Sequence, residues 1–502
     1  MLDAVLSGLL QVLSPDSMML MMIGIFIGFV VGVLPGIGGP VAMALMLPFT
    51  FGMPPIHVFA FLLGMKVVTS TTGDITAVLF GIPGEATSAA TVLDGHPMAR
   101  KGQAGRALGA VLMSSLVGAI IGALALGLSI PVIRPIVLAF GPPEFFMLTV
   151  VGLIFIASLS RGQMLRGLIM GCLGLLIALV GIDPQAGVPR YAFGQLELWD
   201  GIGIVPVVIG LFGGPEILQL MLSKESIAGK SASRKIVGVG QGILDTFRYW
   251  KTVAVAGLIG AGIGVIPGVG GSVAQFIAYG HAKQTSKHPE EFGKGSIDGL
   301  LAAGGNNNAK DGGALIPMIA IGLPGSVSTA ILLNAFLISG LNPGPEMLTT
   351  HLDVTFSMVW ITIIANIIVV ILALPLLKPL ARLTFTEGPI LVPFLLILVV
   401  LGAYAENNRM FDIWVMATSA FVGVVCLRWN WPRAPLLLGA VLGDLCERYL
   451  FLSSSLYGWS WIQRPLVIVL AIAAVAILFK TGWDVRKHAR DRQAASLKEV
   501  RS

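Results

Sequence analysis

The sequence predicts an all-α polytopic membrane protein built from two inverted-topology repeats that contain broken or re-entrant helices. Of its 502 residues, 55% are hydrophobic and only 12% are charged, which is about half the charge of an average soluble domain. Apolar runs long enough to cross a bilayer recur along the chain, and Gly–Pro motifs recur in its two halves. The basic residues sit in short connectors, which argues against a nucleic-acid surface.

The chain begins with acidic residues and has no lysine or arginine before Lys66. A signal peptide needs a basic first region, so we expect residues 1–17 to be a retained interfacial segment. Crossing a bilayer takes about 17–25 apolar residues. The candidate spans are 18–34, 107–128, 144–159, 167–181, 202–222, 252–267, 354–377, 389–404, 412–427, 435–451 and 464–480. The sequence thus predicts about eleven full crossings plus two hairpin regions.

The connectors between these spans divide sharply by charge. Those on one side, including the linker 223–251 and the tail, hold 22 lysines and arginines, and those on the other side hold seven. Basic residues concentrate on the cytoplasmic side of membrane proteins. We therefore expect the amino terminus outside and the carboxyl terminus inside.

Two short motifs occur twice. GVLPGIGGP at 32–40 recurs as GVIPGVGGS at 264–272, and GIPGEATS at 81–88 recurs as GLPGSVST at 322–329. Each half has an odd number of ordinary crossings, which forces the halves into opposite orientations. Inverted repeats of this kind are typical of secondary transporters, whose substrate lies near the bilayer midplane. A duplicated structural protein is the alternative.

The predicted organisation follows from the repeat. It consists of an interfacial segment (1–17), transmembrane repeat 1 (18–222), a cytoplasmic linker (223–251), transmembrane repeat 2 (252–451), an extra transmembrane helix (452–480) and a basic cytoplasmic tail (481–502).

The Gly–Pro motifs interrupt helices at membrane depth. Proline removes a backbone donor and glycine permits positive φ, and such backbone is tolerated only beside protein or a water-filled cavity. A helix that restarts after the break presents free N–H groups and a positive dipole end to an anionic ligand. The substrate-binding candidates around these breaks are Gly38, Gly84, Glu85, Ala86, Thr87, Gly270, Gly325, Ser326 and Ser328. The alternative is that the glycines only allow close helix packing.

Both irregular stretches also contain ionisable side chains, which are costly in a membrane and are functional candidates by default. Lys66 and Lys310 are expected to balance the charge of an anionic substrate. Thr71, Asp74, Asn307 and Asp311 are the candidate ligands of a coupling cation, either Na⁺ or H⁺. Alternatively, Lys310 with Asp311, or Lys66 with Asp74, neutralise each other in structural pairs. No metal beyond such a Na⁺, no other cofactor and no catalytic residue is expected.

At this point three segments resemble a known family. PGIGG, GIPGEATSAATVLDGHPMARKGQAGRALG (81–109) and NNAKDGGALIPMIAIGLPGS (307–326) resemble the large membrane subunit of the tripartite tricarboxylate transporters, the TctA family. The resemblance departs from the family pattern in two places. The stretch before the first PG motif reads LLGMKVVTSTTGDITAVLFGIPGE, and Lys310 and Asp311 stand where the family usually has small uncharged residues.

The resemblance implies a multi-pass protein of the bacterial inner membrane that imports tri- or dicarboxylates such as citrate, driven by a cation gradient. It also implies two partners, a small four-helix membrane subunit similar to TctB and a periplasmic solute-binding protein similar to TctC. A channel and a membrane-embedded enzyme remain the alternatives. The chain has no Walker A motif, which argues against an ATP-driven pump.

Overall fold

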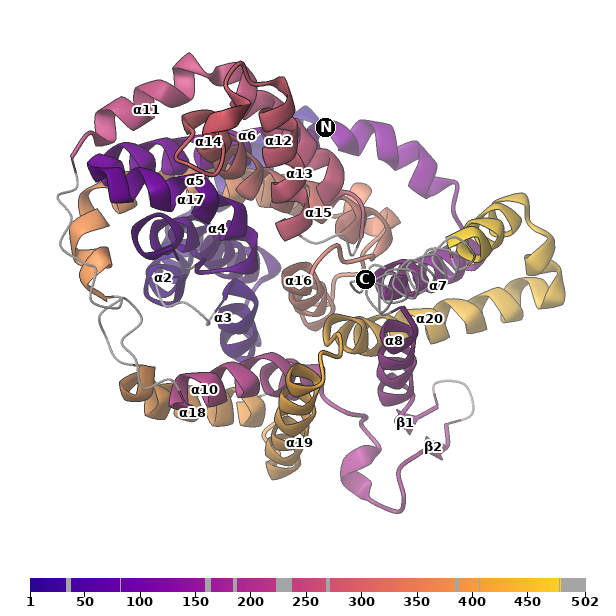
Figure 1. Ribbon diagram of the computed structural model, residues 1–502. Coiled ribbons are helices and arrows are strands. Elements are labelled where there is room, and N and C mark those ends of the chain that lie inside the picture. The colour runs from indigo at the N-terminus through magenta and orange to yellow at the C-terminus, as the bar shows by residue number, and fades with distance from the viewer. Residues whose placement is uncertain are drawn as a thin grey trace, which may run out of the picture. The chain divides into compact units, whose positions relative to one another are not determined.

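The computed structural model describes residues 1–32, 38–81, 83–158, 164–183, 187–222, 237–267, 271–383, 388–405, 407–477 and 479. The chain divides into two compact units (Figure 1). Unit 1 comprises Met1–Val137 and Gly203–Val424, and unit 2 comprises Leu138–Ile202 and Val425–Ser502. Unit 1 therefore takes helices from both predicted repeats. The predicted domain boundaries follow the repeats instead, and they stay a prediction.

Unit 1 holds most of the helices. They are α1 (Leu2–Val12), α2 (Pro15–Gly32), α3 (Gly39–Met46), α4 (Pro55–Phe80), α5 (Ala89–Met98), α6 (Ala104–Leu138), α9 (Ile204–Val208), α10 (Gly214–Leu222), α11 (Val239–Arg248), α12 (Trp250–Gly264), α13 (Gly271–Thr285), α14 (Ile297–Asn307), α15 (Ala309–Ile321), α16 (Val327–Ile338), α17 (Leu352–Leu383), α18 (Gly388–Ala405) and α19 (Met410–Arg428). Short 3₁₀ or π turns precede or link several of them: η1 (Leu47–Thr50), η2 (Ala86–Ser88), η3 (Ala99–Gln103), η5 (Ile209–Gly213), η6 (Pro289–Glu291) and η7 (Pro345–Leu348).

Unit 2 is built around one long helix. The helix α20 (Ala434–Tyr457) packs against α7 (Pro142–Ser158) and α8 (Met164–Ala178), and it continues through η8 (Gly458–Gln463) into a helix over Pro465–Ile477. The remaining elements are η4 (Leu196–Leu198) and two short strands, β1 (Gly181–Ile182) and β2 (Pro189–Arg190). The strands pair antiparallel, with Gly181 opposite Arg190. Two ion pairs of largely buried carboxylates with partly exposed arginines occur in this unit, because Glu144 lies 2.7 Å from Arg464 and Glu447 lies 2.6 Å from Arg190.

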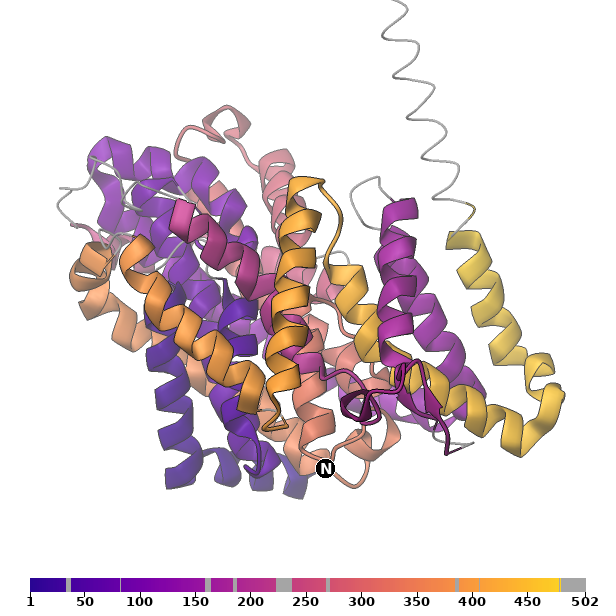
Figure 2. The same ribbon diagram turned by 90° about the horizontal axis from the view of Figure 1, so that it is seen from below.

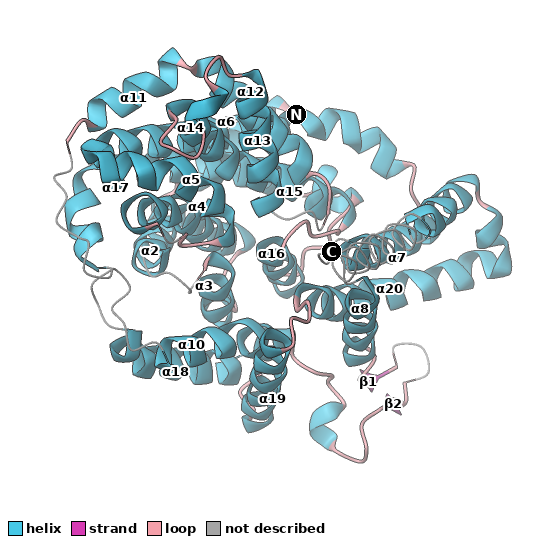
Figure 3. Cartoon of the chain, viewed as in Figure 1, coloured by secondary structure: helices cyan, strands magenta, loops and turns pink. Residues whose placement is uncertain are grey.

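The all-α prediction is confirmed for the described residues, in which β1 and β2 are the strands (Figure 3). Five described helical segments are long and apolar enough to cross a membrane: Pro15–Gly32, Pro55–Leu79, Ala89–Leu138, Leu352–Leu377 and Met410–Arg428. The pair Ala434–Gln463 and Pro465–Ile477, bent by 73°, makes up to six. The total number of crossings, their orientation and the inversion of the repeats stay predictions.

One element differs from the sequence analysis. The stretch that contains Lys66 and Asp74 is expected to be irregular and is absent from the candidate spans, but it forms the continuous helix α4. Its polar residues lower its hydropathy, which explains why the apolar pattern fails there. They are tolerated because α4 is surrounded by protein and most of its residues are buried.

A row of glycines in α2 lets α4 pack closely against it. Gly24, Gly28 and Gly32 follow one another at intervals of four residues along α2, which places them on one face of the helix. A Cβ atom at Gly24 would lie 2.2 Å from the backbone oxygen of Phe61 of α4, and one at Gly28 would lie 2.8 Å from that of Met65. Small residues let the two backbones approach closely, so α2 and α4 lie side by side (Figures 1 and 2).

Some features of the first half of unit 1 recur in the second half. The helices α4 and α15 each end on a glycine in the left-handed conformation, Gly81 with φ 73° and Gly322 with φ 70°. Only glycine adopts this conformation at no steric cost. The contacts are also exchanged between halves, because α3 packs against α16 while α13 packs against η2 and α5. This correspondence supports the internal repeat.

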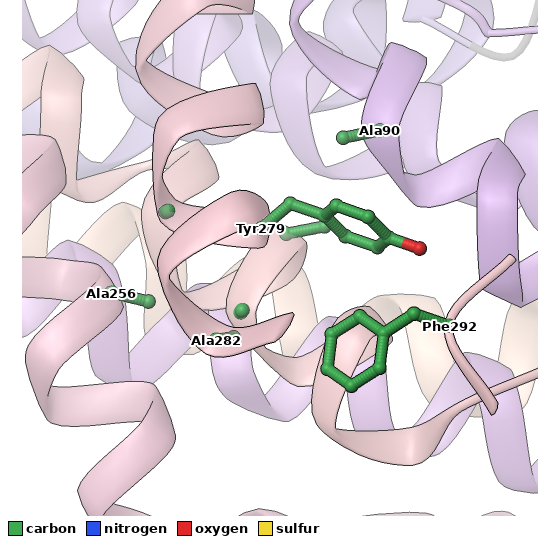
Figure 4. Close-up of a cluster of buried hydrophobic side chains, with 8 residues drawn as sticks. Ala90, Ala256, Tyr279, Ala282 and Phe292 are labelled. Atoms are coloured by element: carbon green, nitrogen blue, oxygen red, sulfur yellow. The ribbon is translucent and has the colours of Figure 1, made fainter. Parts of the chain in front are cut away.

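Asp94 of α5 ties the first half to the second. Its Oδ1 accepts hydrogen bonds from the backbone N–H groups of Gly293 (2.9 Å), Gly295 (2.8 Å) and Ser296 (2.8 Å), and its Oδ2 accepts one from the Tyr279 hydroxyl (2.9 Å). The Tyr279 ring packs edge-on against Phe292, in a cluster with Ala90 and other small side chains (Figure 4). The start of α14 is thereby fixed to α5.

We expect Asp94→Ala to destabilise the protein strongly. It leaves three backbone donors and a hydroxyl unpartnered, and each such group costs about 1–3 kcal/mol when buried. Tyr279→Phe removes only one bond to a charged acceptor, about 1.5–3 kcal/mol, and keeps the ring packing. Thermal unfolding of the purified protein in detergent measures both variants. Equal losses in the two variants would contradict the role of the backbone bonds.

Candidate functional site: a charged cluster beside a pocket

Four ionisable side chains from separate parts of unit 1 meet in its interior. The Lys66 ammonium of α4 lies 3.6 Å from a carboxylate oxygen of Glu85 and 3.4 Å from one of Asp311. Asp311 in turn lies 3.0 Å from the Lys310 ammonium, both in the first turn of α15. The side chains of Lys66, Glu85 and Lys310 are 5–7% exposed. With all four groups ionised the cluster has no net charge.

Local structure fixes Glu85 in this cluster. The residue stands at the start of η2, directly after the break that follows α4. Its Oε1 accepts a hydrogen bond of 2.6 Å from the N–H of Gly39, the first residue of α3, and its Oε2 accepts one from the Thr87 hydroxyl. The Lys66 ammonium also donates to the Ser70 hydroxyl, one turn along α4. Each charge is therefore paired, as burial requires.

A second network, made of uncharged side chains, surrounds Asp74, which lies about two helical turns after Lys66 on α4. The Asp74 carboxylate accepts hydrogen bonds of 2.8 Å from the Thr91 hydroxyl and the Asn307 amide. Asn308 donates to the Thr71 hydroxyl (2.9 Å) and to the side chain of Asn366 in α17 (2.6 Å). The break between α14 and α15 is thus held to α4 and α17.

A pocket opens beside the charged cluster. Its lining combines polar groups with an apolar wall: Leu63, Lys66, Val67, Asn308, Asp311, Leu315, Ser328, Thr329, Leu332, Thr362 and Asn366. Asp311 is the most exposed of the four charged residues, with 24% of its side chain accessible. The first turn of α16 forms one end of the pocket through Ser328 and Thr329.

The two helices that restart after the Gly–Pro breaks differ in their first turns. At α16 a capping box forms, in which the Ser326 hydroxyl accepts from the Thr329 N–H and the Thr329 hydroxyl accepts from the Ser326 N–H. The N–H groups of Val327 and Ser328 have no partner among the described residues. At α5 the N–H of Ala90 donates to the Gln275 side chain of α13. Only α16 therefore begins against the pocket.

Gly84 and Gly325 stand in different surroundings. A Cβ atom at Gly84 would lie 2.5 Å from the Cα of Gly73, so this glycine permits close packing of the break on α4. At Gly325 the nearest atoms would be 3.3 Å away. The packing explanation therefore suffices for Gly84.

The structure brings most of the expected site residues together. Lys66, Asp311 and Ser328 line the pocket, Glu85, Thr87 and Lys310 complete or support the charged cluster, and Thr71, Asp74 and Asn307 belong to the Asp74 network. Gly38, Gly84, Gly325 and Ser326 are absent from the pocket lining. Gly270 and the side chain of Ala86 lie outside the described residues. The roles assigned to these residues stay predictions.

The ion pairs in the structure differ in part from the structural pairs, Lys310 with Asp311 or Lys66 with Asp74, that the sequence suggested as an alternative. Lys310 and Asp311 do form a pair, but Lys66 pairs with Glu85 and Asp311 rather than with Asp74. The sequence analysis assigned no site role to Asn308, Thr329, Thr362 and Asn366, which also line the pocket. Asn366 could have been identified from the sequence, because a single amide side chain within an otherwise apolar span costs free energy in a membrane.

Three consecutive asparagines carry buried oxygens without partners. The Oδ1 atoms of Asn306, Asn307 and Asn308 have no hydrogen-bond partner within the described part of the chain. Buried polar atoms usually find a partner, so these oxygens are free to accept a ligand. No group of three or more His, Cys, Asp or Glu side chains suited to a metal ion occurs among the described residues.

Comparison with known proteins now decides the family. The model of the tripartite tricarboxylate transporter TctA family matches residues 18–438. The chain belongs to this family. An uncharacterized 52.8 kDa protein from the TAR-I ttuC' 3' region of Agrobacterium vitis is 34% identical over 438 residues, which cover 87% of each chain. A second, from the TAR-II ttuC' 3' region of Agrobacterium vitis, is 35% identical over 191 residues, 38% of this chain and 79% of that protein. No solved structure matches.

Membership of the TctA family, together with the apolar helices, makes the chain a multi-pass membrane protein and a transporter subunit rather than an enzyme. The family as a whole works in tripartite systems, whose other members are TctB and TctC. The family match covers both halves of unit 1, including the charged cluster and the pocket.

We expect Gly39→Ala to disturb the charged cluster and Gly38→Ala to leave it intact. A Cβ atom at Gly39 would lie 2.5 Å from Glu85 Oε1 and 2.3 Å from the Thr69 hydroxyl, whereas at Gly38 the nearest described atom would be 3.5 Å away. Gly38 also has an ordinary φ of −66°. Thermal unfolding midpoints in detergent compare the two variants. Equal unfolding midpoints would contradict the close packing of Glu85 against the start of α3.

Proposed function

We propose that the protein is the transport subunit of a binding-protein-dependent secondary transporter that imports organic carboxylates across the bacterial inner membrane, driven by a Na⁺ or H⁺ gradient. The observation that carries this proposal is a basic group at the pocket: the Lys66 ammonium lines it, and the first turn of α16 forms its end. Membership of the TctA family supplies the context of a carboxylate transport system.

The pocket has the chemistry to hold a small carboxylate. One carboxylate of the substrate would accept bonds from the Val327 and Ser328 N–H groups and from the hydroxyls of Ser328 or Thr329. A helix N-terminus favours such an anion through its dipole and its free donors. Lys66 supplies the positive charge on the other side. The apolar wall, made by Leu63 and the other aliphatic residues of the lining, favours a short carbon skeleton.

The Asp74 network suits the coupling cation. Asp74, Thr71 and Asn307 offer hard oxygen atoms, and the Oδ1 of Asn307 has no partner among the described residues. Asn307 lies where the chain breaks between α14 and α15, and Asp74 and Thr71 of α4 contact that break. Transporters coordinate coupling ions at broken helices. Na⁺ bound there, or a proton carried by Asp74 or Asp311, would offset the negative charge of the substrate.

The topology and the partners belong to the same proposal. The repeats are inverted, the amino terminus is outside and the carboxyl terminus is inside, as the distribution of basic residues indicates. The longest connector predicted from the sequence is the linker 223–251, which is too short to form a domain that captures a dilute solute. A periplasmic binding protein would therefore deliver the carboxylate, and a small four-helix subunit would complete the complex.

We expect Lys66→Met to abolish carboxylate uptake, because the uncompensated charge of the anion costs several kcal/mol in the membrane interior. The test uses proteoliposomes that contain the membrane subunits, with the binding protein added outside, and follows uptake of radiolabelled citrate and succinate under Na⁺ and H⁺ gradients. Lys287→Met, which removes a lysine at an exposed position, is the matched control and should transport normally.

Two results would contradict this proposal. Uptake that persists in Lys66→Met would remove the pocket from the substrate path. Flux that does not saturate, or that needs no cation gradient, would favour the channel alternative.

A further inference from the structure

Asp311 differs from the other members of the charged cluster in how it is held. Glu85 is fixed by the backbone N–H of Gly39. The Asp311 carboxylate, by contrast, is in contact only with side chains among the described residues, namely Lys310 (3.0 Å), Lys66 (3.4 Å) and the Ser70 hydroxyl (3.4 Å). Those contacts can be released without any change of the backbone.

Asp311 is also the carboxylate that faces the pocket. It lines the pocket together with Lys66, whereas Glu85 and Lys310 do not, and 24% of its side chain is exposed against 6% for Glu85. The position next to the Lys66 ammonium that a substrate carboxylate would take is therefore already occupied by a carboxylate of the protein.

Charge balance makes this arrangement consequential. Lys66 and Lys310 are balanced by Glu85 and Asp311, so an entering anion would add uncompensated negative charge in a region of low dielectric. Asp74, the other acidic residue nearby on α4, accepts hydrogen bonds from Thr91 and Asn307 and lies within electrostatic range of Lys310, but it forms no ion pair with either lysine among the described residues. Either a cation enters with the anion or one of the two cluster carboxylates loses its charge.

We propose that Asp311 is a tethered counter-carboxylate that the substrate displaces from Lys66, and that it takes up one proton as it leaves. The proton comes from hydronium of the bulk solution, whose O–H bond breaks to leave water as an O–H bond forms on the Asp311 carboxyl, and the substrate carboxylate replaces the Asp311 oxygen beside the Lys66 ammonium. No other bond changes. Each anion then enters with one proton, which offsets the charge of the carboxylate that replaces Asp311 beside Lys66. This inference rests on the proposed function.

The groups that set the charge around Asp311 are those of its own helix and of the packed elements. They are Lys310 on α15, Lys66 on α4, and Glu85, which contacts Lys66 from the break before η2. A carboxylate outside the cluster provides the control. Glu291→Gln and Asp311→Asn each remove one carboxylate charge, but Glu291 is exposed and only the second variant removes the displaceable carboxylate.

Proton uptake on anion binding is the direct test and needs no variant. Purified protein in weakly buffered detergent solution at pH 7.5 is mixed with succinate, which is fully ionised there, and released or absorbed protons are read with a pH indicator. The expected result is one proton absorbed per succinate bound. Correspondingly, the Kd for succinate should rise about tenfold for each pH unit. Repeating the measurement with citrate guards against a poor probe.

The variants locate the proton. Asp311→Asn should bind the anions at least tenfold more tightly than the wild type at pH 8.5, absorb no proton and show a Kd independent of pH. Glu291→Gln should keep the proton uptake and the pH dependence. Binding without proton uptake in the wild type, or proton uptake that survives in Asp311→Asn, would overturn this inference and leave the proposed function standing. Failure of the wild type to bind either anion at any pH, also when it is purified together with its small membrane subunit, would overturn both.

Discussion

Two lysines and two carboxylates inside unit 1 have to neutralise one another, and much of the surrounding architecture follows from this constraint. Burying an isolated charge costs more free energy than the folded state of a protein typically gains. The charges of Lys66, Glu85, Lys310 and Asp311 can therefore be buried only together. They come from two distant parts of the sequence, with Asp311 245 positions after Lys66. The pairing therefore requires that the two halves of the chain be folded against each other.

The fold meets this requirement with small residues and broken helices. The glycines of α2 allow α4 to lie close enough for Lys66 to point into the interior, and the glycine-terminated ends of α4 and α15 turn the chain back. The break after α4 then brings Glu85 to the start of α3. Asp94 fastens the start of α14 to α5, which helps to set the position from which α15 presents Asp311.

The same constraint connects the structure with transport. A neutral cluster can be buried in a membrane protein. In the proposed mechanism, its lysine becomes available to a substrate anion only when one of the cluster's own carboxylates moves away. The neighbouring Asn307 and Asn308, with their unpartnered oxygens, place further oxygen atoms close to the same helix break. In the proposed function, recognition of the anion and compensation of its charge would involve a few side chains of α4, α14, α15 and α16.

Composition and motif spacing predict the helical class and the functional region. Polar residues in an apolar sequence stand out, which is why Lys66, Asp74, Asn307 and Asp311 could be named in advance. Their partners could not, because the choice between Asp74 and Asp311 as the partner of Lys66 depends on packing across distant segments. The helix α4 was missed for a related reason, since its polar residues disrupt the apolar pattern and are compensated only by tertiary contacts. Asn366 and Asp94 likewise acquire their roles from residues far away in the sequence.

The central claim is that Lys66 and Asp311 interact directly across the two halves, and a double-mutant cycle tests it most directly. Unfolding midpoints in detergent are measured for Lys66→Met, Asp311→Leu and the double variant. Because removing either partner leaves the three remaining charges of the buried cluster unbalanced by one unit, each single variant should be strongly destabilised. The double variant should be less destabilised than the sum of the two. Strictly additive losses would show that the two side chains do not sense each other and would contradict the account.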